Sequence, residues 1–168
     1  MPIGLLIDIV DRTPTETRLM GLDLGTKTIG LAISDAGQSI ATPLRTIERR
    51  KFATDLAEIG RVSREYDIGG YVFGWPLNMD GSISGSCDRV RSFIDEMKNY
   101  PQDLGLKQGA DLWIALFDER LSTSAVEDFL INDVDMSRTK RDQVVDKLAA
   151  QLILQGALDF LWLARPSA

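Results

Sequence analysis

The chain has 168 residues, of which 44% are hydrophobic and 26% charged, and its formal net charge is −6. This length and balance are typical of one folded domain with a substantial core. The chain contains no histidine and one cysteine, Cys87, which excludes Ser-His-Asp and Cys-His catalysis, histidine-ligated zinc and an internal disulfide. Oxygen atoms must therefore hold any bound metal, which favours Mg²⁺ or Mn²⁺.

The acidic balance of charge argues against non-specific binding to nucleic acid, because basic residues that neutralise phosphates supply that affinity. Basic residues do cluster at 45–51 and 138–141, and each cluster is consistent with phosphate contacts or with the solvated start of a helix. The apolar stretches are interrupted, and the N-terminus lacks the basic leader and cleavage site of a secretory signal. We therefore expect a cytoplasmic protein that makes no membrane contact.

Residues 1–17 are expected to form an N-terminal extension, and residues 18–168 a single domain. The segments 18–24, 27–35 and 39–47 are rich in β-branched and apolar residues and are separated by short turns, which predicts three antiparallel strands. Pro43 in the third segment indicates an edge strand or a bulge.

Helices and strands alternate in the rest of the chain. Apolar residues at helical spacing predict helices at 51–66, 84–98, 122–130 and 137–163, the last with Ser137 as its N-cap. Nearly continuous apolar runs at 68–75 and 111–120 predict strands that are covered on both faces. The order predicts an α/β fold with a mixed five-stranded sheet, three antiparallel strands followed by parallel strands, flanked by helices.

An acidic residue interrupts the first apolar strand, in the sequence Gly-Leu-Asp-Leu-Gly-Thr-Lys at 21–27. Burial of this carboxylate, Asp23, is costly unless it is paired or binds a metal. The alternative is an aspartate on the solvated face of the strand, or one that hydrogen-bonds to the turn. The Asp-x-Gly-Thr pattern occurs in nucleases and also in actin-like ATP-binding proteins.

Two further carboxylates, Asp118 and Glu119, end the strand at 111–120, at the edge where open α/β sheets bind ligands. Side chains alternate between the faces of a strand, so we expect one of the two to enter a site, and we favour Glu119. Arg120 could pair with either carboxylate, and Thr123 could serve as a helix N-cap.

The last predicted helix contributes a third acidic position, Asp146. We expect this residue at the boundary of the helix face that packs on the sheet, a face formed by Val145, Leu148, Ala149 and Leu152. The small pair Ala149–Ala150 would allow close approach to another element. The alternative is an exposed aspartate balanced by Lys147 or Arg141.

Together, Asp23, Glu119 and Asp146 supply a cluster of oxygen ligands from distant parts of the chain. Such a cluster suits two hard cations about 4 Å apart, which clamp the attacking and leaving oxygens of a phosphodiester. Beside it, Trp75 could stack on a base and Asn78 could hydrogen-bond to substrate. A turn at Asn78-Met79-Asp80-Gly81 is an equally good explanation of those residues.

Four ordered segments resemble the YqgF (RuvX-like) family: GLDLGTKTIGLAISD, FGWPLNMDGS, FDERLSTSAVE and VVDKLAAQLILQ. The family was first described as Holliday-junction resolvases and later linked to processing of the 5′ end of pre-16S ribosomal RNA. The resemblance implies a ribonuclease-H-like fold, and it places Asp23, Glu119 and Asp146 on the family's acidic positions. Trp75 departs from the family, which usually has Leu there.

The resemblance further implies contacts to substrate, or support of the site, from residues outside the acidic cluster. These residues are Thr26, Lys27, Asn78, Arg120 and Thr123.

The leading hypothesis is a Mg²⁺- or Mn²⁺-dependent endonuclease, with a two-metal site, that acts on structured RNA in ribosomal RNA maturation. Precursor ribosomal particles are a plausible partner, since an acidic protein alone binds nucleic acid weakly. Alternatives are a four-way DNA junction resolvase, a nucleic-acid-binding or transcription-associated module without turnover, and an actin-like ATP-binding domain, for which the chain is short. The sequence is consistent with a monomer or a homodimer.

Overall fold

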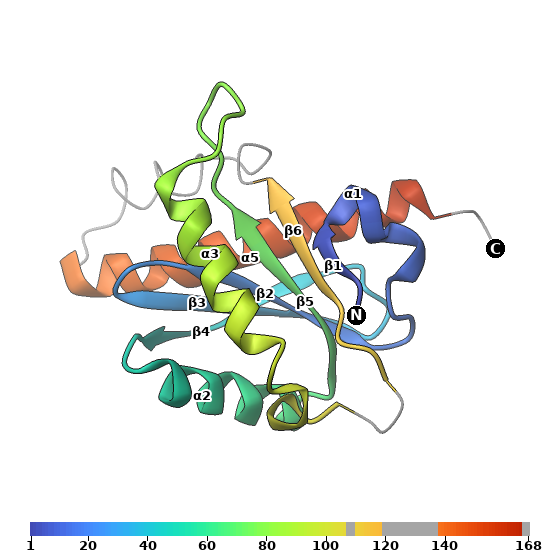
Figure 1. The fold of residues 1–168 in the computed structure, drawn as a ribbon, viewed down its shortest axis with the longest axis horizontal. Coiled ribbons are helices and arrows are strands. Elements are labelled where there is room, and N and C mark those ends of the chain that lie inside the picture. The colour runs from blue at the N-terminus through green and yellow to red at the C-terminus, as the bar shows by residue number, and fades with distance from the viewer. Residues whose placement is uncertain (107–109, 119–137, 166–168) are drawn as a thin grey trace.

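The protein forms one mixed sheet covered by helices on both faces (Figure 1). The computed structural model describes residues 1–106, 110–118 and 138–165, with the backbone alone for 138–144. In this part of the chain the sheet has six strands in the order β1-β6-β5-β2-β3-β4.

The first half of the domain is the predicted antiparallel meander. It comprises β2 (Arg18–Leu24), β3 (Thr28–Ser34) and β4 (Ala41–Glu48). Pro43 lies in β4, which is an edge strand, and the register between β3 and β4 shifts beside it. Both features that proline predicted are therefore present, because proline cannot donate a hydrogen bond to a regular central ladder.

The second half adds parallel strands. β5 (Ile68–Trp75) pairs parallel with β2, and β6 (Ile114–Asp118) pairs parallel with β5. Because these three strands run in the same direction, their carboxyl ends meet at one edge of the sheet. The last residues of the three strands, Leu24, Trp75 and Asp118, lie at that edge, and Asp23 directly precedes Leu24.

Alternation along the strands divides the core into two layers. Leu22 and Phe73 face α2 (Phe52–Glu65) and α3 (Gly85–Met97), and their layer includes Ile59 and Phe93 of those helices. Leu19, Val72 and Ala115 face the other side, where α5 (Arg138–Ala164) packs. A turn of 3₁₀ helix, η2 (Pro101–Leu104), precedes the return to β6.

The face of α5 that packs on the sheet differs from the predicted one. Val145, Leu148, Ala149 and Leu152 are only half-buried. The fully buried stripe comprises Ala150, Ile153, Leu154, Ala157, Leu158 and Leu161. Asp146 lies one turn before Ala150 and so continues this stripe rather than flanking it.

One stretch of α5, Val145–Ala164, is long and apolar enough to cross a membrane by length and composition, with a mean hydropathy of 1.2. A helix that packs its apolar side into a core satisfies the same test. Within this stretch the buried stripe forms the layer against Leu19 and Val72.

The expected five strands are corrected to six, because the N-terminal extension is part of the sheet. β1 (Ile3–Leu5) pairs parallel with β6, and α1 (Leu6–Ile9) and η1 (Val10–Arg12) follow it. Leu6 and Ile9 are buried, and the indole Nε1 of Trp113 donates a hydrogen bond to the carbonyl of Ile9 (3.3 Å). The helix predicted at 122–130 and Ser137, the predicted N-cap of the last helix, lie outside the described residues.

Candidate active site

Asp23 occupies the carboxyl end of β2 on the face that α5 covers. Its neighbours Leu22 and Leu24 point into the opposite core layer, so alternation sends Asp23 toward α5. The residue is half-buried and pairs across the ladder with Gly30 of β3. Cross-strand partners share a face of the sheet, so Gly30 also faces α5.

Gly30 is the point at which the helix reaches the sheet. A Cβ atom built on Gly30 would lie 2.1 Å from the backbone oxygen of Asp146, and one on Gly21 would lie 2.9 Å from that of Ala150. Glycine is therefore required at both positions for α5 to sit this close. The contact seats the backbone of Asp146 over Gly30, the cross-strand partner of Asp23, on the same face of the sheet.

Thr28 fixes the side chain of Asp146. Its hydroxyl donates a hydrogen bond of 2.5 Å to Oδ2 of the carboxylate. Sequence analysis missed Thr28, because a β-branched residue in a strand is ordinarily explained by strand propensity. The available signal was its position two residues before Gly30 on the face of Asp23.

The turn between β2 and β3 presents two of the predicted substrate-contacting residues. Thr26 and Lys27 are both exposed there: Thr26 lies two residues after the end of β2, and Lys27 directly precedes β3. The amide of Gly25 donates to the carbonyl of Thr28 (2.9 Å) and closes the turn. Their position beside the two aspartates fits contact with a phosphate.

Asn78 lies in an exposed turn after β5. Its Nδ2 donates to the hydroxyl of Ser82 (2.9 Å) and its carbonyl accepts from Gly81 (2.8 Å), and Gly81 has a φ of 89°. The Asn-x-Asp-Gly segment is thus the turn that the alternative explanation predicted. The expected base-stacking role of Trp75 is wrong, because the side chain is 6% exposed and Arg91 covers its ring.

The third carboxylate of the predicted cluster is not covered by the structure. Glu119, Arg120 and Thr123 lie outside the described residues. Phe117 packs in the α5 layer, so alternation sends Asp118 to the opposite face. Within the described ranges, no group of three acidic or cysteine residues could hold a metal ion.

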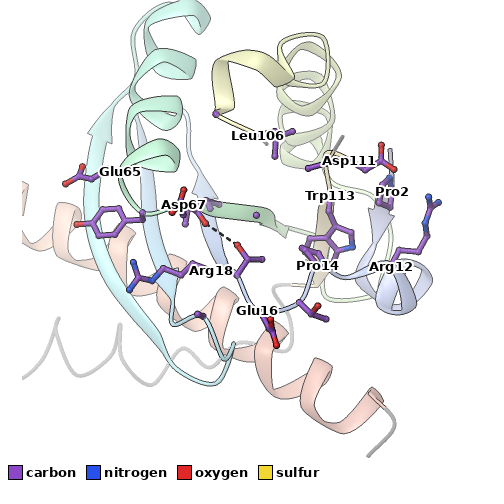
Figure 2. A pocket seen from close by; sticks show the side chains of 18 residues that line it. Pro2, Arg12, Pro14, Glu16, Arg18, Glu65, Asp67, Leu106, Asp111 and Trp113 are labelled. Carbon is purple, nitrogen blue, oxygen red and sulfur yellow. Dashed lines mark hydrogen bonds between the residues drawn. The ribbon is translucent and has the colours of Figure 1, made fainter. Parts of the chain in front are cut away.

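A hollow of about 700 Å³ lies at the opposite edge of the sheet (Figure 2). It is lined by Arg18 and Ile68, at the amino ends of β2 and β5, and by Arg12 and Pro14 of the N-terminal extension. Thr17 donates a hydrogen bond to the carbonyl of Asp67 on its wall. Arg18 begins β2 and Asp23 lies near its end, so the hollow is at the opposite end of the strand from Asp23 and is separate from the Asp23 and Asp146 carboxylates.

Comparison with known proteins gives the family of this chain. A family model described as "RuvX: Holliday junction resolvase" matches residues 17–160. A Rhodospirillum centenum protein named "Putative pre-16S rRNA nuclease" is 50% identical over 161 residues, which cover 96% of this chain and 83% of that protein. A protein of the same name from Rhodospirillum rubrum is 45% identical over 166 residues, covering 99% and 98% of the two chains.

Among solved structures, RuvC from T. thermophilus in complex with a Holliday junction substrate superposes with a TM-score of 0.51. The match covers 90% of this chain and 99% of that chain at 10% sequence identity, so it bears on the fold alone. The fold is the expected ribonuclease-H-like one, with the meander followed by parallel strands and helices on both faces. The chain belongs to the RuvX family.

Proposed function

We propose that this protein is a metal-dependent endonuclease that hydrolyses phosphodiester bonds in structured RNA, at the 5′ end of pre-16S ribosomal RNA. The observation that carries the proposal is the convergence of Asp23 and Asp146 on one face of the sheet, beside an exposed turn. A carboxylate placed next to a second carboxylate is costly unless a cation or a proton compensates for the repulsion. A cation bound between the two carboxylates would offset that repulsion.

The donor set fits a hard cation. The chain has no histidine, and the two aspartates offer carboxylate oxygens, which are the ligands that Mg²⁺ and Mn²⁺ prefer. We propose Glu119 as the third ligand, because it directly follows β6 and Asp118 points away from α5. When bound at these residues, the cations would stabilise the charge that develops on the attacking and leaving oxygens of the phosphodiester.

The other residues of the site position the carboxylates and the substrate. Thr28 holds Asp146 in one orientation through its hydroxyl, which reduces the reorganisation needed during reaction. Lys27 is exposed at the turn and can contact a phosphate as a point charge. We propose Thr26, Asn78, Arg120 and Thr123 as further contacts to the nucleic acid.

The names of the relatives support RNA as the substrate, because two proteins that align with nearly the whole chain are named as pre-16S rRNA nucleases. The description of the family supports a second candidate, a resolvase of four-way DNA junctions. A resolvase cuts two symmetric strands and so requires a homodimer, whereas an RNA nuclease can act as a monomer. We place the protein in the cytoplasm, with precursor ribosomal particles as the partner that presents the RNA.

The test is cleavage of a precursor 16S rRNA fragment and of a synthetic four-way DNA junction, assayed side by side with Mg²⁺, Mn²⁺ or EDTA. We expect the RNA to be cut only with metal, and Asp23→Asn to reduce cleavage to background while the protein stays folded. Cleavage of the junction alone would establish the resolvase instead.

Asp159→Asn is the matched control, because Asp159 is an exposed carboxylate on the same helix as Asp146. This variant should cut at the wild-type rate. Wild-type cleavage by Asp23→Asn, purified free of contaminating nucleases, would refute the assignment of the site.

A further inference from the structure

The turn between β2 and β3 is held from outside by one arginine. Arg49 follows the last residue of β4, and its backbone amide donates to the carbonyl of Lys27 (2.8 Å). Its guanidinium Nη1 donates to the carbonyl of Gly25 (2.9 Å). Arg49 therefore binds both ends of the turn, Gly25 through its side chain and Lys27 through its backbone.

Arg49 is itself held by a buried carboxylate. Oδ2 of Asp55 lies 3.7 Å from Nε of Arg49, and the Asp55 side chain is 1% exposed. Oδ1 of Asp55 accepts a hydrogen bond from the amide of Arg50 (2.9 Å), whereas Oδ2 has no hydrogen-bond partner within the described part of the chain. The Phe93 ring centroid lies 5.8 Å from the guanidinium carbon.

Burial of Asp55 costs free energy of folding, so stabilising the fold is a poor explanation for the pair. Burying a carboxylate is unfavourable even when it is paired, and an apolar pair of similar shape is often as stable. The arginine is 22% exposed, so it could have been solvated without Asp55. The ion pair with Asp55 instead fixes the orientation of the Arg49 guanidinium, so that Nη1 faces the carbonyl of Gly25.

The turn that Arg49 holds joins the two halves of the proposed site. Asp23 lies two residues before Gly25, and Thr28, which holds Asp146, directly follows Lys27. A shift of the turn would move Asp23 relative to Asp146 and would also displace the exposed Lys27. Misplacement of reacting groups by about 1 Å can reduce a rate about 100-fold.

We propose that Asp55 and Arg49 are positioning residues of the nuclease site: Asp55 orients Arg49, and Arg49 fixes the turn that sets Asp23 against Thr28 and Asp146. The inference rests on the proposed function for its effect on cleavage. Its structural part, the restraint of the turn, can be measured without any substrate.

The experiment compares Arg49→Gln and Asp55→Asn with the wild-type chain in two measurements. Because each variant releases the guanidinium from its fixed direction, hydrogen exchange at the amide of Gly25 should be about tenfold faster or more. In RNA cleavage, kcat should fall about 10- to 100-fold with KM little changed, since the groups that bind the substrate remain. The Asn variant keeps the oxygen that accepts from Arg50, so it should fold normally.

Two further variants separate positioning from general charge. Arg61→Gln removes an exposed arginine paired with Glu58 (2.6 Å) on α2, and it should leave both measurements unchanged. Arg49→Lys retains the charge but lacks the planar fork that serves Gly25 and Asp55 together, so kcat should stay reduced. Full rescue by lysine would show that Arg49 acts as a charge on the substrate and would overturn the proposal.

The outcomes also separate this inference from the proposed function. Unchanged exchange at Gly25 in both variants overturns the inference, whatever the cleavage assays give. If the wild-type chain cuts neither RNA nor DNA, the proposed function fails, while faster exchange in the variants still supports the restraint of the turn.

Discussion

Replacement of Gly30 by alanine should damage both the fold and the site. The added Cβ would lie 2.1 Å from the backbone oxygen of Asp146, whereas Cβ atoms in proteins essentially never approach closer than 3.0 Å. The oxygen belongs to the backbone of α5, so a side-chain rotation cannot relieve the overlap. The helix must move by roughly 1 Å, and overpacking of this kind costs about 1 to 3 kcal/mol.

The stability effect is measured by urea and thermal unfolding, in which Gly30→Ala should lower Tm by about 2 to 12 °C. Because the shift displaces Asp146 from Asp23, RNA cleavage at a temperature well below Tm should also fall about 100-fold. Gly4→Ala is the control, since a Cβ there meets nothing within 4 Å. If Gly30→Ala were as stable as the wild type, the close packing of the α5 backbone on Gly30 would be refuted.

Two other perturbations test single contacts. Thr28→Val removes the hydroxyl that donates to Asp146, and in urea titrations it should lower the free energy of unfolding by about 1 to 2 kcal/mol. Thr26→Val, in the exposed turn, is the control and should change the free energy of unfolding little. Equal losses in the two variants would contradict the role of Thr28. Burial raises the pKa of Tyr71 to about 12, above the value near 10 of an unfolded tyrosine, so its contribution to stability is complete below about pH 10 and is lost as pH rises toward 12. Urea unfolding at successive pH values should show a shallower decline in that window for Tyr71→Phe, and an identical decline would count against the raised pKa.

Much of the fold was predictable because its signals are local. The apolar run at 68–75 is β5 with those bounds, and Pro43 indicated both the edge strand and the register shift. β1 gave no such signal, since it has three residues and pairs with a strand more than 100 residues away. Its place in the sheet depends on a long-range contact.

The packed face of α5 could not be read from periodicity, because apolar residues occur around most of that helix. The face is set by backbone approach: Ala150 meets Gly21, and small residues on both sides allow that distance. Sequence analysis did identify the small pair at 149–150 and the two aspartates. It could not find Arg49, whose partners Gly25 and Asp55 are defined by hydrogen bonds and burial rather than by any motif.

The hydrogen bond between Thr28 and Asp146 joins residues 118 positions apart in the chain. During synthesis, the meander that carries Asp23 leaves the ribosome many seconds before α5, at about 5 to 20 residues per second. Until α5 docks, Gly21 and Gly30 face solvent and the second carboxylate is missing from the site. The assembly of the site is therefore coupled to one of the latest events in folding, and a nascent chain holds the two aspartates apart until that helix has emerged.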